Sequence, residues 1–249
     1  MAPPGPTWLI LPTYNERENV ESFVEAVRVQ LAECVPDYRV LIVDDASPDG
    51  TGQLADQLAA KYNDVEVLHR PRKEGLGQAY IAGFKVALAG GAELLIEMDS
   101  DFSHKPDYLQ PLIAATAHAD LTLGSRYIPG GGVTDWGPVR RLISRGGSWY
   151  ARRWLNVPVR DLTGGFKCFR RAVLEEIDLN SVRSQGYTFQ IELTYRALQA
   201  GFKVREIPIV FEDRRAGESK MNKRIVLEAV LLVPRLRFAG RHKVGDLGR

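Results

Sequence analysis

The strongest constraint on the fold is a regular alternation between short aliphatic or β-branched runs and longer stretches with helical periodicity. Short runs of this kind are typical of strands, and helical stretches between them build βαβ units with a mostly parallel sheet. The five predicted strands lie at residues 7–12, 38–47, 65–70, 93–99 and 119–126. The sequence therefore predicts an α/β fold in which helices flank a central sheet.

The segments between these strands carry apolar residues at intervals of three and four. In the first segment these residues are Val20, Phe23, Val24, Val27 and Leu31. Helices are also predicted at residues 52–62 and 77–91, on either side of the third strand. The 249 residues suit one large α/β domain or two small ones. Because no repeat, linker or boundary interrupts the chain, we expect a single domain.

The pattern changes after Arg126, where residues 127–138 are rich in glycine and proline. This composition predicts an irregular loop. The segments beyond it are predicted as a basic amphipathic stretch at 139–155, a Gly-Gly turn within 161–169, a helix near 189–200, a strand at 203–213 and a final helix at 222–238.

Charge, cysteines and apolar runs exclude several classes of protein. Lys and Arg number 33 against 31 Asp and Glu, so no whole-molecule field draws the chain onto nucleic acid. Cys34 and Cys168 lack a metal or redox spacing, which favours reduced thiols in a cytosolic protein. The first residues do not predict a secretory signal, and the longest apolar run, 225–233, is shorter than the roughly 20 residues of a membrane-spanning helix. No G-x-G-x-x-G follows the first strand, which argues against a dinucleotide-dependent dehydrogenase.

Polar loops follow four of the predicted strands and should meet at one edge of a parallel sheet, where ligands bind. Asp99 and Asp101 follow the fourth strand with one residue between them. Close carboxylates repel each other, and a shared Mg²⁺ or Mn²⁺ would offset that repulsion while taking other ligands from phosphates and water. A solvated turn is the alternative for this pair alone. Asp44 and Asp45 end the second strand at the same edge, where an acid can bind a base or a ribose hydroxyl.

Eight sequence blocks occur in an order that is found in one group of enzymes. They are PTYNERENV, VDDASPDGT, KEGLGQAY, DSD, GSRY, LTGGFKCFRR, GYTFQIEL and DRRAGESK. From about Leu11 to Lys220 the chain resembles inverting family 2 glycosyltransferases with the GT-A fold, and the later blocks resemble the dolichol-phosphate (polyprenol-phosphate) mannose synthase subgroup. The resemblance implies a Rossmann-like, mostly parallel central sheet in a single catalytic domain at residues 7–220. Residues 221–249 would form an amphipathic helix and a basic tail.

The same resemblance implies an activity. It is the inverting transfer of mannose from GDP-mannose to a polyprenyl (dolichyl-type) monophosphate, which gives polyprenyl-phosphate mannose and depends on Mg²⁺ or Mn²⁺. Pro12, Tyr14 and Glu16 would border the nucleotide. Val43 and Asp45 would lie near the base and the ribose.

The metal would be held by the D-x-D block. Asp99 and Asp101 would bind the ion on the donor diphosphate, with Ser100 beside them and Asp101 acting in catalysis. Members of the subgroup often carry glutamine two residues after the second acid. This chain has Ser103 there, so the resemblance supplies no third protein ligand.

Basic residues are needed because the donor diphosphate and the acceptor phosphate must approach one sugar carbon. An anionic acceptor needs charge compensation more than a strong base, and arginine supplies it with a bidentate fork. The candidates for catalysis and donor binding that match family blocks are Arg126, Arg214 and Lys220. The candidates for the acceptor phosphate are Arg126, Arg140, Arg141 and Arg145, and for the last three a solvated helix face is the alternative.

Four other polar residues are less clearly part of a site. Lys73 matches the subgroup but is equally interpreted as a surface lysine. Gln190 and Glu192 could line the sugar site or begin a helix that packs on the core. His104 is expected to be a hydrogen-bonding surface residue.

A lipid acceptor requires contact with a membrane surface. The predicted helix at 220–238 combines apolar and basic residues, so we expect peripheral attachment at the cytoplasmic face, directly or through a separate transmembrane anchor protein. The alternative is that its apolar face packs on the domain core. A glucosyl or other sugar specificity on the same fold also stays open, as does a nucleotide-binding module without turnover.

Overall fold

The computed structural model describes residues 5–134, 136–182, 184–212 and 233–238. Within these residues the main sheet has seven strands in the order β3-β2-β1-β4-β7-β5-β8. The strands are β1 Thr7–Thr13, β2 Tyr38–Asp44, β3 Val65–His69, β4 Leu94–Glu97, β5 Leu121–Ser125, β7 Lys167–Arg170 and β8 Val204–Pro208. Neighbouring strands are parallel except at β7, which runs antiparallel to β4 and β5. The predicted α/β domain with a mostly parallel sheet is confirmed.

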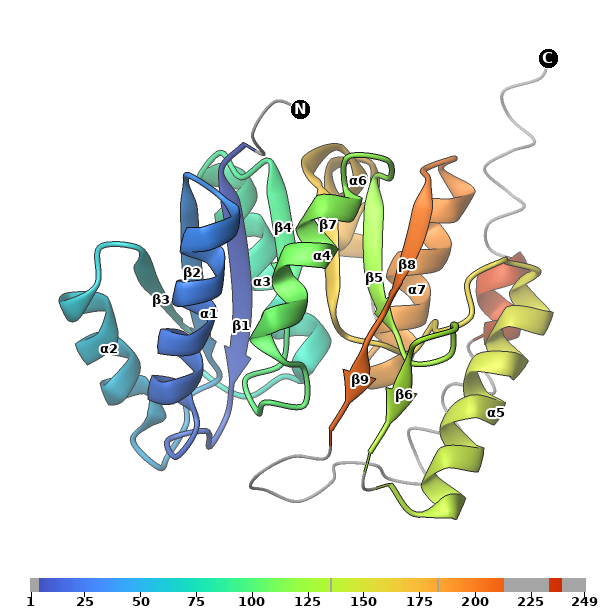
Figure 1. Ribbon diagram of the computed structural model, residues 1–249. Helices are drawn as coiled ribbons and strands as arrows, with labels where there is room; N and C mark the ends of the chain where they lie inside the picture. The colour runs from blue at the N-terminus through green and yellow to red at the C-terminus, as the bar shows by residue number, and fades with distance from the viewer. Residues whose placement is uncertain (1–4, 135, 183, 213–232, 239–249) are drawn as a thin grey trace.

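Helices cover both faces of this sheet (Figure 1). One face carries α1 Val20–Cys34, α2 Thr51–Lys61 and α4 Leu109–Ala115. The other carries α3 Leu76–Ala89, α6 Arg171–Glu176 and α7 Gly186–Gln199. A further helix, α5 Pro138–Leu155, packs beside α7 and β5 at the end of the molecule. Two short 3-10 helices lie at Pro106–Tyr108 and Leu179–Ser181.

The first strand shows why a continuous apolar run is needed. Leu9 and Leu11 pack toward α1 and α4, whereas Ile10 packs toward Phe84 of α3, and all four side chains are fully buried. A strand that is covered on both faces has no polar side to show to solvent. Gly83 lets α3 approach closely, because a Cβ at that position would lie 2.5 Å from Cγ2 of Ile10.

The glycine-rich segment after Arg126 is not wholly irregular, so that part of the prediction is wrong. β6 Gly132–Val133 pairs in parallel with β9 Val210–Phe211 in a second, two-stranded sheet. The backbone N–H of Gly132 donates to the carbonyl of Ile209 at 3.0 Å. Pairing with a segment that lies far along the chain, rather than local composition, makes β6 a strand.

Only part of the predicted C-terminal helix can be compared with the structure. Residues 233–238 are helical, and Val233 is buried in a cluster with Leu155 and Tyr195. The rest of that helix and the boundary between residues 220 and 221 lie outside the described residues. In the part of the chain that the structure describes, no helix is both long enough and apolar enough to cross a membrane.

Candidate active site

The carboxyl ends of β1, β2 and β4 meet at one edge of the sheet (Figure 1). The loops that follow them form a pocket, here called the sheet-edge pocket. It is lined by Pro12, Thr13, Tyr14, Glu16, Asp45, Lys73, Leu76, Ala79, Asp99, Ser100 and Asp101. The structure therefore brings together the residues predicted for the nucleotide and the metal, with the exception of Val43.

The two acids at the end of β2 have different roles. Asp44 accepts a hydrogen bond from the Ser47 hydroxyl at 2.6 Å and so fixes the turn. Asp45 faces the pocket and forms a buried ion pair with Arg70. Burial raises the pKa of Asp45, and the Arg70 charge offsets part of that rise. Val43 is fully buried against α3, so the structure does not bring its side chain into the pocket.

Asp99 and Asp101 are both held by local hydrogen bonds. The Tyr80 hydroxyl donates to Oδ1 of Asp99 at 3.2 Å, and the backbone N–H of Ser103 donates to Oδ1 of Asp101 at 3.0 Å. Burial, together with the Asp99 charge, raises the pKa of Tyr80, which keeps the phenol protonated as a donor. The Ser100 hydroxyl donates to a carbonyl of β1 and joins the two strand ends.

The donor set of the sheet-edge pocket fits a hard divalent ion. Among the described residues, no group of three or more His, Cys, Asp or Glu side chains could hold a metal. Two carboxylates are nevertheless sufficient for Mg²⁺ or Mn²⁺ when substrate phosphates and water complete the coordination. Asp99 and Asp101 are therefore the residues that could hold such an ion.

A buried ion pair joins β4 to β7, two residues before Asp99. Nζ of Lys167 on β7 lies 3.2 Å from Oε1 of Glu97 on β4, and both side chains are fully buried. Lys167 also donates to the backbone carbonyl of Gln190 at 3.1 Å and to its side-chain oxygen. Burial raises the pKa of Glu97 and lowers the pKa of Lys167. This pair was not predicted, although a lysine inside the apolar run FKCF is a signal of a buried charge.

A second pocket follows β5 and is here called the arginine pocket. It has a volume of about 360 Å³ and is lined by Arg126, Tyr127, Ile128, Pro129, Gly131, Gly132, Val133, Arg141, Arg145 and Arg160. Four arginines line this pocket, and guanidinium groups fit an anion with several oxygens, such as a phosphate. Arg160 was not among the predicted residues, because it lies outside the basic stretch at 139–155 and matches none of the family blocks.

Arg126 is held by a residue that the sequence did not single out. Its Nε and Nη2 atoms each donate to the carboxylate of Asp161 at 2.7 Å, and Nη2 also donates to Thr163 at 2.8 Å. Burial opposes ionisation of Asp161, but the charge and hydrogen bonds of Arg126 hold its pKa below the ordinary value. The pKa of Arg126 is raised by the same pairing against the effect of burial. Arg126 therefore lines the arginine pocket while its guanidinium is bound by Asp161 in a bidentate ion pair.

The turn at Gly164 and Gly165 places the two pockets next to each other. A Cβ on Gly165 would lie 4.0 Å from Oδ2 of Asp99, and a Cβ on Gly164 would lie 3.8 Å from the carboxyl carbon of Asp161. The acid of the sheet-edge pocket and the acid that fixes Arg126 therefore flank the same two-residue turn.

His104 lies against Phe166, the residue that directly follows the Gly164–Gly165 turn. Its ring stacks on Phe166 with centroids 5.3 Å apart and meets the ring of Phe211 edge-on at 5.1 Å. The Arg126 guanidinium lies 5.5 Å from the centroid of Phe211. His104 is only 2% exposed, so the expected surface position is wrong. Aromatic residues from distant parts of the chain bury it.

The sequence model described as Glycosyl transferase family 2 matches residues 8–178, which is more than half of the chain. The chain belongs to glycosyl transferase family 2. This glycosyltransferase is 49% identical over 238 residues to the polyprenol monophosphomannose synthase of Mycolicibacterium smegmatis, with 94% of this chain and 88% of that protein covered. It is 46% identical over 232 residues to the undecaprenyl-phosphate mannosyltransferase of Micrococcus luteus, with 93% and 94% covered. These relatives confirm the resemblance to the polyprenol-phosphate mannose synthase subgroup.

Solved structures share the fold of this glycosyltransferase. Glucosyl-3-phosphoglycerate synthase from Mycobacterium tuberculosis, in complex with Mn²⁺, UDP-glucose and phosphoglyceric acid, superposes with a TM-score of 0.66 at 17% identity, covering 95% of this chain and 80% of that chain. The complex of the same enzyme with Mn²⁺ and UDP-glucose gives a TM-score of 0.65 at 19% identity, covering 94% and 80%. At this identity the likeness shows the fold alone, and it confirms the predicted GT-A fold.

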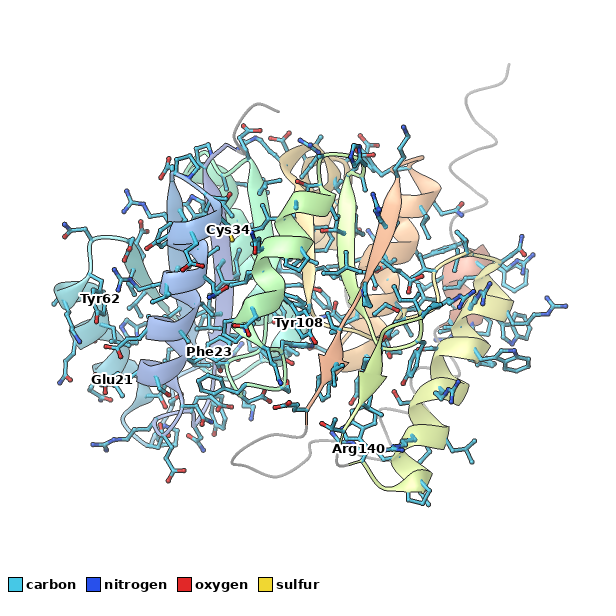
Figure 2. All side chains as sticks on the ribbon, in the orientation of Figure 1. Glu21, Phe23, Cys34, Tyr62, Tyr108 and Arg140 are labelled. Atoms are coloured by element: carbon cyan, nitrogen blue, oxygen red, sulfur yellow. The ribbon has the colours of Figure 1, made fainter. Side chains whose placement is uncertain are left out.

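The structure places the remaining candidates of this glycosyltransferase outside the two pockets or outside the described residues. The Arg140 guanidinium stacks over the Trp136 ring at 4.2 Å and does not line the arginine pocket; Figure 2 shows it at the start of α5. Glu192 accepts hydrogen bonds from Ser184 and Arg196, which fits the structural interpretation. The positions of Arg214 and Lys220 lie outside the described residues.

Proposed function

We propose that this glycosyltransferase transfers mannose from GDP-mannose to a polyprenyl monophosphate, with inversion at the anomeric carbon. The names of the two relatives support both the sugar and the acceptor class. The observation that carries the proposal is an acidic pocket and an arginine pocket on the two sides of the Gly164–Gly165 turn. One pocket suits a metal-bound diphosphate and the other suits a phosphate anion.

The donor half of the reaction belongs to the sheet-edge pocket. Asp45 offers its carboxylate to a base or ribose hydroxyl, and Asp99 and Asp101 would hold Mg²⁺ or Mn²⁺. The ion supplies charge neutralisation for the departing nucleoside diphosphate when it is bound. The lining residues that border the nucleotide are Pro12, Tyr14, Glu16 and Ser100.

The acceptor half belongs to the arginine pocket. Arg141, Arg145 and Arg160 hold the acceptor phosphate and offset its charge. A phosphate oxygen forms the new bond to the anomeric carbon while the bond from that carbon to GDP breaks on the opposite face, which inverts the configuration. The acceptor is already anionic at neutral pH, so no side chain has to remove a proton with a high pKa.

Three basic residues have a less direct part in the proposal. Arg126, held in place by its ion pair with Asp161, lines the arginine pocket and is proposed to help position the acceptor phosphate there. Arg214 and Lys220 match family blocks and are proposed to contact the donor phosphates on that ground alone. The enzyme is proposed to work peripherally at the cytoplasmic face of a membrane, directly or with a transmembrane anchor protein.

The test is a transfer assay on the purified full-length chain with a short polyprenyl phosphate. GDP-mannose and UDP-glucose are offered in parallel, each with Mg²⁺, Mn²⁺ or EDTA, and the lipid product is identified by mass spectrometry and NMR. The proposal expects a mannosylated lipid of inverted configuration, formed with either metal and abolished by EDTA. A glucosylated product would contradict the assignment of mannose as the sugar. Retention of the anomeric configuration would contradict the inverting mechanism. Full turnover in EDTA would contradict the metal requirement.

A further inference from the structure

Helix α5 exposes an unusual amount of apolar surface. Among the described residues, most of the large apolar side chains that face solvent lie on this one helix, and they are Val139, Leu142, Ile143, Trp149 and Trp154. Leu142 is 74% exposed and Trp149 is 66% exposed. Figure 2 shows side chains of α5 projecting on the side away from the sheet. A surface this apolar normally marks a contact with a partner or a lipid.

The packing of α5 fixes which face is turned outward. Ser148, Ala151 and Leu155, at helical spacing, are buried against the domain. Leu142 and Trp149 are seven residues apart and therefore share the opposite face two turns from each other. The 18 residues of α5 make a rod about 27 Å long, so the apolar strip is extended rather than a single spot.

A basic strip runs beside the apolar one. Arg141, Arg145 and Arg152 are spaced by four and seven residues, which puts them along one flank of the helix. Arg141 and Arg145 also line the arginine pocket. The apolar strip, the basic strip and the proposed acceptor site therefore follow one another around α5.

We propose that α5 lies in the interfacial plane of an anionic lipid bilayer, with Leu142 and Trp149 at the boundary between headgroups and acyl chains. This inference rests on the proposed lipid-phosphate acceptor. An exposed helix with Trp and Leu on one face and arginines on its flank has the composition of helices that lie on membranes. Tryptophan favours the level of the headgroups, and the arginines complement anionic lipid. The acceptor phosphate sits at the same level, which lets it enter the arginine pocket without leaving the membrane.

Vesicle flotation of the full-length chain tests the surface directly. Wild-type protein is expected to float with vesicles of phosphatidylglycerol and phosphatidylcholine more than with phosphatidylcholine alone, and less in high salt. The double variant L142Q/W149Q should partition at least about tenfold more weakly, because two apolar side chains no longer enter the interface. The matched control is Val29→Gln, which removes an exposed apolar residue of α1 and should float like wild type.

Activity measurements separate this inference from the proposed function. L142Q/W149Q should lose transfer to an acceptor embedded in vesicles but keep transfer to a short acceptor in solution, and that retained turnover also shows that it folds. Wild-type protein that does not float, or a double variant that floats like wild type, overturns the inference. In the first of these cases, light scattering at rising concentration would show whether a second copy covers α5. If wild type floats through α5 yet transfers mannose to neither acceptor, the proposed function fails and the membrane contact stands.

Discussion

Asp161 fixes the position of the Arg126 guanidinium group. The two side chains form a bidentate pair that is almost completely buried, so neither charge has water to replace its partner. Removal of one member of such a pair leaves an uncompensated buried charge, which is far more costly than the loss of an exposed ion pair. The local fold of the arginine pocket thus depends on a residue outside the predicted set.

Asp161→Asn should lower the free energy of unfolding by about 3 kcal/mol at pH 7. The pKa of Asp161 is lowered in the folded protein, so its stabilisation is fully present above the unfolded value of about 3.9 and is lost as pH falls through the lower folded value. The difference between wild type and variant should therefore narrow below about pH 3.9. Urea unfolding at a series of pH values measures the free energy of unfolding of both proteins. If their difference stays constant across that range, the ion pair is not the source of the lost stability.

Asp101→Asn tests the metal role with little change in shape. Asparagine keeps the side-chain oxygen that accepts the Ser103 N–H but removes the charge. Transfer should fall by about a hundredfold or more, while the thermal melting temperature stays close to that of wild type. The matched control is Asp107→Asn, an exposed aspartate that lines neither pocket. Equal rates for the two variants would remove Asp101 from the mechanism.

Residues of the site were predictable where local sequence carries the signal. Asp45, Asp99 and Asp101 follow apolar strands, and the rule that strand ends share one sheet edge placed them together. Asp161 and Lys167 were not predictable in the same way, because their partners Arg126 and Glu97 lie 35 and 70 residues away in the sequence. The apolar run FKCF indicates that Lys167 is buried, but the partner of each of these residues depends on the tertiary fold.

At the scale of elements, close approach of α3 to β1 depends on one glycine. Gly83→Ala would put a methyl group 2.5 Å from Cγ2 of Ile10 and 3.1 Å from Cγ2 of Val43, so the helix must shift. We expect a loss of about 1–3 kcal/mol in the free energy of unfolding.

Gly147→Ala supplies the control, because a Cβ there meets no atom within 4 Å. That change, also inside a helix, should stabilise the protein by about 0.5–1 kcal/mol. Chemical denaturation of both variants gives the answer. If both variants change the free energy of unfolding in the same direction, packing against Ile10 does not explain the result for Gly83→Ala.

Elements were predicted best where the chain repeats a simple pattern. The strands β1 to β5 and the helices α1 to α3 follow long apolar periodicities, so their order was clear from the sequence. β7 was predicted only as part of a turn region, because it has four residues and runs antiparallel between two strands that precede it in the sequence. β6 has two residues, and only its pairing with β9 distinguishes it from loop.

For the molecule as a whole, β7 has a consequence for function. Its insertion between β4 and β5 separates the strand that carries Asp99 and Asp101 from the strand that leads to Arg126. The turn before β7, at Gly164 and Gly165, then fills the space between the two pockets. The fold therefore holds the acidic sheet-edge pocket and the arginine pocket at a fixed separation. The central claim of the proposed function is that the first binds the donor and the second binds the acceptor phosphate.

Two-substrate kinetics of Arg160→Gln test this division most directly. Arg160 is exposed and lines the arginine pocket, so its loss should not disturb folding, and Arg205→Gln on β8 is the matched control outside both pockets. The KM for polyprenyl phosphate should rise at least about tenfold, as expected for a lost charge-assisted contact, while the KM for GDP-mannose stays within about twofold. An unchanged acceptor KM, or a rise in the donor KM instead, would contradict the assignment of the arginine pocket to the acceptor phosphate.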